Sequence, residues 1–548
     1  MYVNNLSYNP KDPLLPLPGD NNIRWGIQVF TTRNLYALAP DSIKLYEAPN
    51  SIRIECHELS WAGQQQRSQG SVKASVCLQD GTYSWSIEAW HHEPVKAIKL
   101  LLHNLPEEPL KAGFWHPTSP PGETQKPSRD MPIRWRYPWP EWLTPWACVG
   151  EAGKAICISV RDSEVRAKRF YVHRPPYLEY PEVEVICEED ARRWDSYFST
   201  PEIRMRIANS FDEITEDFES HLSFLEEAYG LQRWEIRQDV PKWMHDIKLV
   251  VNLHGQHWTG YVFNTFPKMA KALEEITKHI PGRNVLCYIP GWEGRYYFQY
   301  PYYSPGEDLG GEREFARLVS KAHQLGVKIM PMFGANGANA QLYERWREAA
   351  FLNRTGRVVR LINAPDWDTD RFGEDDQVFL NPGEPMFREH LLQQISQTVE
   401  KFEVDGVFLD TSACWFNDPR YNLYEGYKQL VESLRARFPN LLVAGEGWYD
   451  ALLALFPVNQ SWLGIYRGYR FHELLTRYSR ALGHLAQGAP GTGSTGVHEG
   501  GFYPSIYKQP AFGHIPCITI ADDTLEKYSG LVAQICKAAL GMAQWPDE

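Results

Sequence analysis

Two carboxylates stand at the ends of two apolar runs in the second half of the chain. The run Val404–Asp410 ends in Asp410, and the run that begins at Leu441 leads into Glu446. Short, almost continuous apolar runs are typical of parallel strands buried on both faces. Neighbouring strands lie ~4.8 Å apart, so two carboxyls at their ends could approach the ~5–5.5 Å used by a retaining glycosidase. The predicted roles are nucleophile for Asp410 and general acid/base for Glu446.

These runs belong to a longer alternation of strand and helix patterns that starts near Trp243. Eight strands alternating with helices in some 300 residues are typical of a (β/α)8 TIM barrel, whose catalytic groups stand at the C-terminal strand ends. The candidate strands are Ile247–Leu253, Val285–Ile289, Val327–Met332, Val404–Asp410, Leu441–Ala444, Trp462–Tyr466, a weaker Thr495–His498, and Cys517–Ala521. The candidate helices are Lys268–Ile280, Glu312–Leu325, Pro385–Phe402, Leu423–Phe438, Arg470–His484 and Thr524–Met542.

The first part of the chain has a different periodicity. Alternating runs such as Ser51–Cys56, Ser71–Val76 and Tyr83–Ala89 follow one another without long helical patterns, which indicates a β-sandwich. A helical stripe then begins at Phe211. We therefore expect an α/β protein with a β-sandwich over residues 1–205, a linker helix region over 206–242, and the catalytic barrel over 243–548.

Other side chains that follow the predicted strands could line a cleft. They include aromatic rings, which stack on the apolar faces of sugars, and polar groups that can hydrogen-bond to sugar hydroxyls. The candidate substrate-binding residues are His254, His257, Trp258, Trp292, Glu293, Arg295, Asn336, Trp415, Trp448, Arg467, His498 and Glu499.

Composition narrows the class of partner. Aromatic residues make up 13% of the 548 residues, in keeping with a glycoside or oligosaccharide substrate, although large proteins also bury aromatic rings in their cores. The net charge of -12 argues against nucleic acid or an anionic membrane. The nine scattered cysteines form no CxxC pair, so neither a disulfide framework nor a zinc site is expected. We expect a cytoplasmic protein with no cofactor; the oligomeric state stays open.

Three alternatives remain at this point. His254 and His257 together with Asp410 could hold a metal, as in metal-dependent barrel hydrolases, although the fourth and fifth strand ends add no histidine. Glu499 could be the nucleophile, as in β-glycosidase barrels, but those enzymes also use a glutamate where this chain has Asp410. The chain could also be a catalytically silent carbohydrate-binding protein or a glycosyl-transferring scaffold.

The barrel half resembles the α-amylase-like retaining glycoside hydrolases. Asp405–Asp410 is similar to their D-G-x-x-x-D segment and Gly445–Trp448 to their G-E-x-W segment, but Phe408 replaces the arginine that precedes their nucleophile. Their late His-Asp pair is also absent, with only His498-Glu499 nearby.

The aromatic loop over 290–303 and Leu380-Asn381-Pro382 resemble the endo-α-N-acetylgalactosaminidase family and its relatives, over about Trp243 to Trp448. The β-sandwich ahead of the barrel adds to this resemblance. It implies cleavage of an α-glycosidic bond with retention and does not fix the sugar.

Overall fold

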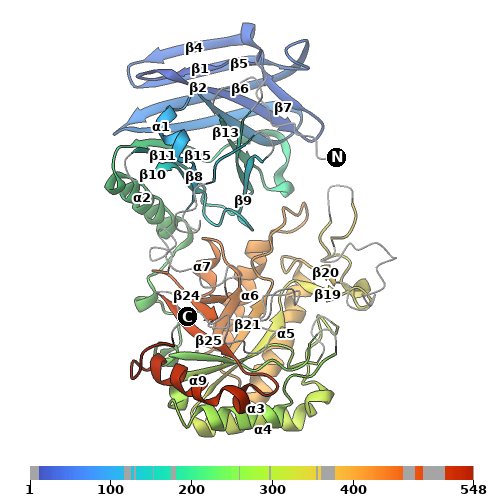
Figure 1. Cartoon of the computed structure of the whole chain (residues 1–548). Helices are drawn as coiled ribbons and strands as arrows, with labels where there is room; N and C mark the ends of the chain where they lie inside the picture. Colours follow the sequence, from blue (N-terminus) through green and yellow to red (C-terminus); the bar gives the residue numbers. More distant parts are fainter. Residues whose placement is uncertain are drawn as a thin grey trace.

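The computed structural model shows two bodies, an N-terminal β-domain and a barrel below it (Figure 1). It describes residues 11–116, 125–128, 131–151, 154–174, 181–257, 260–294, 298–352, 356–359, 377–460, 476–484 and 513–546. The two bodies are the β-sandwich and the (β/α)8 barrel predicted from the sequence, so the predicted fold class is confirmed.

The N-terminal domain is built from antiparallel strands whose side chains alternate between buried and exposed. The strand β5, for example, buries Ile52, Ile54 and Cys56 and turns the residues between them outward. Its strands are β1 (Leu15–Leu17), β2 (Asp20–Thr31), β3 (Leu35–Leu38), β4 (Ile43–Ala48), β5 (Ser51–Trp61), β6 (Gln66–Gln79), β7 (Thr82–His103), β8 (Phe114–Trp115), β9 (Ile133–Tyr137), β10 (Trp146–Glu151), β11 (Lys154–Arg161), β12 (Lys168–His173), β13 (Glu182–Glu188), β14 (Asp195–Ser199) and β15 (Glu202–Ala208), with one helix, α1 (Glu107–Ala112).

The helix α2 (Phe211–Tyr229) leads from the sandwich toward the barrel (Figure 1). Its start is fixed by Ser210, whose hydroxyl accepts a hydrogen bond from the Glu213 amide at 3.2 Å, and it ends at Gly230 in the left-handed conformation. Its buried stripe, with Phe218 and Leu222, packs into a cluster that joins the sandwich residue Trp146 to the barrel residue Trp448. This cluster joins the two domains through apolar packing.

The barrel is closed by eight parallel strands. They are β16 (Leu249–Asn252), β17 (Val285–Ile289), β18 (Lys328–Gly334), β21 (Gly406–Asp410), β22 (Leu442–Glu446), β23 (Val458–Gln460), β24 (Arg480–His484) and β25 (His514–Thr519). The helices around it are α3 (Phe266–Ile276), α4 (Gly311–Leu325), α5 (Pro385–Phe402), α6 (Leu423–Arg437), the short α7 (Leu452–Leu455) and α9 (Thr524–Ala539), and a small hairpin of β19 (Gly337–Asn339) and β20 (Gln377–Phe379) stands beside the barrel.

The sixth and seventh barrel strands differ from the prediction. The predicted strands Trp462–Tyr466 and Thr495–His498 lie outside the described residues, whereas the sixth and seventh positions of the closed barrel are filled by β23 and β24. The predicted helix Arg470–His484 is therefore wrong at its C-terminal end, which is β24. A run as short as Ala481–Leu482 fits a helical and an extended pattern equally well, so periodicity could not decide between them.

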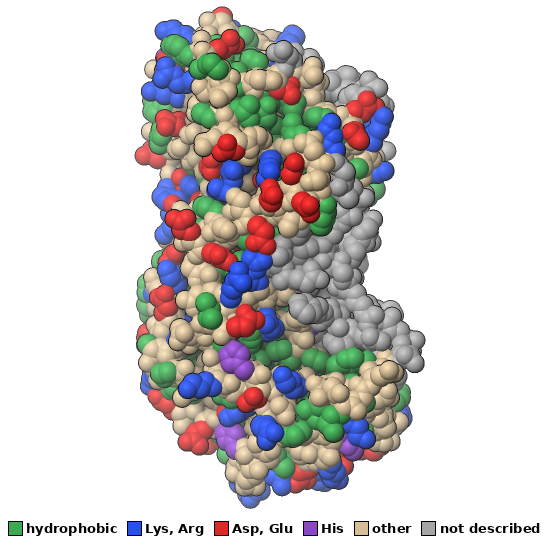
Figure 2. Space-filling view, turned by 90° about the vertical axis from the view of Figure 1, so that its left-hand side faces the viewer, with side chains coloured by type: hydrophobic (Ala, Val, Ile, Leu, Met, Phe, Trp, Pro, Cys, Tyr) green, Lys and Arg blue, Asp and Glu red, His purple; other side chains and the backbone are tan. Residues whose placement is uncertain are grey.

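The remaining predictions for the whole chain concern its surface charge, its cysteines and the possibility of a membrane-spanning segment. In Figure 2 basic and acidic side chains are interspersed over the face shown, with no large basic patch on that face. All nine cysteines are free, and only Cys77 is exposed. No helix in the described ranges is both long and apolar enough to span a membrane.

Candidate active site

Asp410 and Glu446 meet at the ends of neighbouring strands. Register pairs Phe408 with Ala444 and Leu409 with Gly445 along β21 and β22, so the two carboxylates emerge side by side where the strands end. Both are almost fully buried, with 4% and 8% of their surface exposed. The Asp410 carboxyl lies within hydrogen-bonding reach of Glu446. The structure thus brings together the two residues that the sequence predicted as a catalytic pair.

The electrostatics of this pair differ from those of ordinary surface carboxylates. Burial, the negative charge of Glu446 and the hydrogen bond between them raise the pKa of Asp410 well above its usual range, with a smaller contribution from Glu293. Two carboxyls this close do not both ionise readily, because each negative charge opposes the other. Asp410 Oδ2 has no hydrogen-bond partner among the described residues.

The backbone around Thr411 holds the pair in place. Thr411 has a φ of 58°, a left-handed conformation that is rare for a β-branched residue, and in it its amide donates a 2.7 Å hydrogen bond to Glu446 Oε2. The Thr411 hydroxyl contacts Asn336 Oδ1, and Asn336 Nδ2 donates to the Thr411 carbonyl at 3.1 Å. Asn336, predicted to bind substrate, thus lies against the residue that follows Asp410.

Two glycines allow the neighbouring loops to approach. A Cβ on Gly445 would meet Ser412 Oγ at 2.7 Å, and one on Gly447 would meet the Ala413 side chain at 2.6 Å. Gly447 also has a φ of 68°. The segment Gly445-Glu446-Gly447 therefore needs both glycines to bring Glu446 against the loop after Asp410.

Glu293 is a third carboxyl on this side of the barrel, in the loop after β17. It has no exposed surface, and neither of its oxygens has a hydrogen-bond partner among the described residues. Burial raises its pKa to about 8, so it is largely protonated at neutral pH. Tyr303 lies near enough for the two groups to interact electrostatically, and its hydroxyl donates to the Gly334 carbonyl at 2.8 Å.

The two histidines predicted after the first strand are close together and buried. Their ring centroids are 6.1 Å apart, and the loop that carries them packs on the β17 loop, where a Cβ on Gly255 would collide with the Gly291 carbonyl. Within the described ranges, no group of three or more His, Cys, Asp or Glu side chains is arranged to hold a metal ion. His254 and His257 thus lie in the first strand-end loop without forming a recognisable metal centre there.

The predicted tryptophans occupy different environments. Trp292 is fully buried, stacks on Phe315 at 5.1 Å and donates to the Met332 carbonyl at 2.7 Å, so it forms part of the barrel core. Trp448 is 8% exposed and belongs to the cluster that joins the two domains. Trp415, in the loop after Asp410, is only partly buried. Of these three rings, Trp415 presents the most surface near the carboxylates.

The remaining predicted residues lie outside the described residues. They are Trp258, Arg295, Arg467, His498 and Glu499.

Sequence reasoning did not single out Thr411 or Tyr303. Their parts in the site depend on a left-handed backbone conformation and on a loop that folds back toward β18. The only signal in the sequence was position: Thr411 directly follows Asp410, and Tyr303 lies in the aromatic loop over 290–303.

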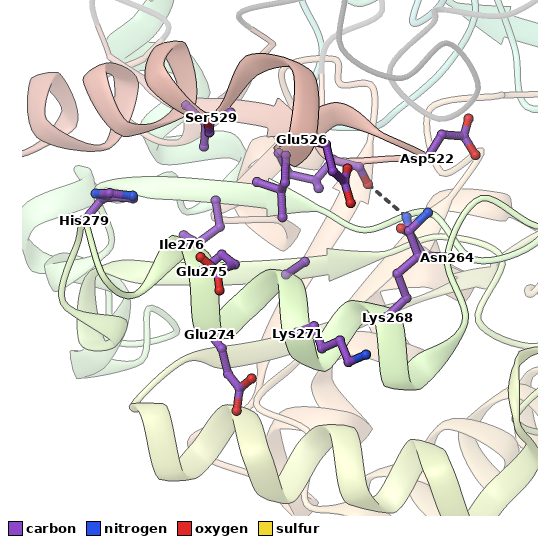
Figure 3. A pocket seen from close by; sticks show the side chains of 14 residues that line it. Asn264, Lys268, Lys271, Glu274, Glu275, Ile276, His279, Asp522, Glu526 and Ser529 are labelled. Carbon is purple, nitrogen blue, oxygen red and sulfur yellow. Dashed lines mark hydrogen bonds between the residues drawn. The ribbon is translucent and has the colours of Figure 1, made fainter.

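Two cavities lie away from this pair. One of about 590 Å³ lies on the flank of the barrel between α3 and α9 and is lined by side chains of both charges, including Lys268, Lys271, Glu274 and Glu526 (Figure 3). Asn264, at its edge, donates to the Ile520 carbonyl at 2.9 Å. Another, of about 1050 Å³, lies between the sandwich and the loop after β21.

Comparison of the sequence with known proteins finds a match to part of the chain. No family model matches the chain. The intracellular maltogenic amylase of Bacillus subtilis is 25% identical over 182 residues, which cover 32% of this chain. The chain matches about a quarter of that relative's length (27%).

Solved structures resemble the chain over both domains. The α-N-acetylgalactosaminidase NagBb from Bifidobacterium bifidum, in complex with GalNAc, has a TM-score of 0.68 at 11% identity, covering 97% of this chain and 93% of that one. The GH36 α-galactosidase AgaA from Geobacillus stearothermophilus has a TM-score of 0.50 at 11% identity, covering 95% and 73%. The likeness confirms the predicted barrel behind a β-sandwich. These proteins are glycoside hydrolases, in agreement with the resemblance seen in the segments around Asp410 and Glu446.

Proposed function

We propose that this chain is a glycoside hydrolase that cleaves an α-glycosidic bond with retention, with Asp410 as nucleophile and Glu446 as general acid/base. The observation that carries the proposal is the contact between two buried carboxyls at neighbouring strand ends of the barrel. The similar solved structures, of an α-N-acetylgalactosaminidase and an α-galactosidase, favour an α-linked substrate.

The closeness of the pair favours retention over inversion. An inverting enzyme keeps its two carboxyls ~6.5–9.5 Å apart, because a water molecule must fit between one of them and the sugar. Carboxyls within hydrogen-bonding reach of each other lie below that range, and opening to the ~5–5.5 Å of a retaining enzyme is a smaller change than opening to the inverting separation. They suit a double displacement, in which one carboxylate itself bonds to the sugar.

In the first step an Asp410 oxygen attacks the anomeric carbon as the bond to the leaving oxygen breaks, and Glu446 gives that oxygen its proton. The product is a glycosyl ester on Asp410. In the second step Glu446 takes a proton from water, the water oxygen bonds to the anomeric carbon, and the ester bond to Asp410 breaks. Two inversions restore the original configuration.

The proposed first step requires ionised Asp410 and protonated Glu446. In the protein without substrate, burial and the charge of Glu446 raise the pKa of Asp410, which favours its protonated form. Two interacting carboxyls titrate as a pair, so a sugar oxygen bound beside Glu446 would draw the proton toward the leaving group.

The polar groups around the pair supply contacts for the sugar. Asn336, His254 and His257 are the described candidates, with Trp415 as a partly exposed ring. Protonated Glu293 could donate a hydrogen bond to a sugar oxygen, since its own oxygens have no partner among the described residues. Trp292 and Trp448 act through packing in this proposal.

A trapping experiment tests both activity and roles. The purified protein is assayed on aryl α-glycosides of N-acetylgalactosamine, galactose and glucose, and the anomer first released is identified by NMR. It is then incubated with the matching fluorinated glycosyl fluoride, and the labelled peptide is identified by mass spectrometry. Label on Asp410 supports the proposal, label on Glu446 reverses the two roles, and absence of turnover on all α-glycosides rejects the activity.

A further inference from the structure

The sandwich domain contacts the loop that follows Asp410. In that loop the side-chain amide of Asn417 makes its hydrogen bonds to the last residue of β13 and to the segment between β13 and β14. Asn417 Oδ1 accepts from the Ala191 amide at 2.8 Å, and Asn417 Nδ2 donates to Glu188 Oε1 at 2.9 Å and to the Glu189 carbonyl at 3.0 Å. Three hydrogen bonds fix this side chain to one place on the other domain.

The sandwich also contacts the loop that follows Glu446. Asp450 in this loop has no exposed surface. Its Oδ1 accepts from the Tyr137 hydroxyl at 2.7 Å, its Oδ2 accepts from the Thr144 hydroxyl at 3.0 Å, and its amide donates to the Leu143 carbonyl at 2.9 Å. The Thr144 hydroxyl is also 2.7 Å from Nε2 of His221 in α2.

We propose that the sandwich domain positions the catalytic pair. It holds the loop after Asp410 through Asn417 and the loop after Glu446 through Asp450. Asn417 and Asp450 are then positioning residues on the barrel side, and Tyr137 and Thr144 are their counterparts on the sandwich side. This inference rests on the proposed function, because it concerns how the nucleophile and the acid/base are kept in register.

Adhesion between the domains does not by itself account for these hydrogen bonds. The apolar cluster that includes Trp146, Phe218 and Trp448 already buries large rings between the sandwich, α2 and the barrel. Apolar burial is not directional, whereas hydrogen bonds fix distance and angle. Directional bonds to both carboxylate-bearing loops are what a catalytic geometry that tolerates little displacement requires, since about 1 Å of misplacement can cost 10²-fold in rate.

The test removes one hydroxyl and measures how turnover depends on the leaving group. Tyr137→Phe keeps the ring and removes the donor to Asp450. Two aryl α-glycosides of the sugar that the wild type hydrolyses are compared, one with a good leaving group and one with a poor leaving group. The ratio kcat/KM reports the first step, whereas kcat also includes the second step, in which Glu446 acts as base. Proton donation by Glu446 matters chiefly for the poor leaving group, so kcat/KM on it should fall about tenfold and on the activated glycoside less than about threefold.

Two controls separate positioning from stability. Tyr36→Phe removes a similar hydrogen bond, from Tyr36 to Glu93 at 3.2 Å, but inside the sandwich, and it should leave kcat/KM on both glycosides unchanged. Thr144→Val removes the second donor to Asp450 and should reproduce the leaving-group pattern if Tyr137→Phe fails to fold. Thermal melting confirms that each variant is folded at the assay temperature.

A variant in the loop after Asp410 provides a second test. Asn417→Ala should lower kcat/KM on both glycosides alike, because a displaced nucleophile slows attack whatever the leaving group. The inference is overturned if Tyr137→Phe and Thr144→Val lower kcat/KM on the two glycosides equally, or no more than Tyr36→Phe does. Wild-type protein that hydrolyses neither glycoside overturns the proposed function and, with it, the positioning role.

Discussion

Two aspartates in opposite environments mark the ends of the strand β21: Asp405 directly precedes it and Asp410 is its last residue. At the start, Asp405 accepts hydrogen bonds from Lys328 Nζ at 2.7 Å and the Ile329 amide at 3.0 Å, and lies 2.9 Å from His323 Nε2. These bonds hold the pKa of Asp405 below its usual value although burial opposes them. At the other end Asp410 faces carboxyls in place of cations, and its pKa is raised.

The difference between the two aspartates corresponds to the different roles of the two faces of a barrel. In (β/α)8 barrels the N-terminal face serves stability and the C-terminal face serves chemistry. Asp405 is satisfied by its partners and stabilises the fold when ionised. Asp410 is held in a state that costs stability, and groups with strongly shifted pKa values gather at functional sites. The same residue type a few positions apart therefore has two uses.

Asp410→Asn should have the largest effect of the changes that follow. It removes the proposed nucleophile, so kcat/KM on the α-glycoside should fall at least about 10³-fold. Stability should hold or rise, because the amide can donate to Glu446 and ends the repulsion between like charges. Kinetics and thermal melting check both expectations, and a variant that keeps a tenth of the activity would remove Asp410 from the mechanism.

Asp405→Asn should show the reverse pattern. It breaks a partly buried ion pair, so the free energy of unfolding should fall by about 2 kcal/mol at pH 7, with kcat unchanged below the melting transition. The pKa of Asp405 is lowered in the native state, so its contribution is present above the unfolded-state pKa of about 4 and is lost as pH falls through the folded value. Wild type and variant should therefore converge in urea unfolding at strongly acidic pH.

Much of this contrast could be predicted from the sequence. The apolar runs that end in Asp410 and Glu446 gave the barrel, the strand ends and the candidate pair, because buried parallel strands have a strong pattern. The strand β23 could not be found in this way. It is only three residues long, Val458–Gln460, and the polar side chain of Asn459 in it is buried. Asn459 donates a 2.6 Å hydrogen bond to the Ser479 hydroxyl, a contact between distant parts of the chain that no local sequence pattern predicts.

The environment of the site was also beyond local patterns. Trp292 and Trp415 are alike in sequence as aromatic residues that follow strands, yet one is core and the other partly exposed. The left-handed backbone conformation of Thr411 and the hydrogen bond from Tyr137 of the sandwich to Asp450 depend on the fully packed structure. Residue type and spacing identified the proposed catalytic pair, and tertiary packing determined what holds it.

Glu293→Gln extends the comparison to a second carboxyl near Asp410. The native pKa of Glu293 is raised to about 8, so its stability contribution is full below the unfolded-state pKa near 4.5 and is lost as pH rises toward 8. The isosteric amide carries no charge, so the variant should be more stable than wild type at pH 8, by about 4 kcal/mol, and nearly equal at pH 4.5. A stability difference that does not change between these pH values would mean that Glu293 is not held neutral.

His323→Ala should have the smallest effect on stability of these changes. It tests which of the partners of Asp405 stabilises this end of the strand. His323 contacts Asp405 at 2.9 Å, but its side chain is 34% exposed, so water competes for the interaction. Asp405 keeps Lys328 and the Ile329 amide in the variant, so no buried charge is left alone. The loss should be below about 0.5 kcal/mol in urea unfolding at pH 6, with no change in kcat. A loss as large as that of Asp405→Asn would show that the histidine, rather than the lysine and the backbone, holds this end of the strand.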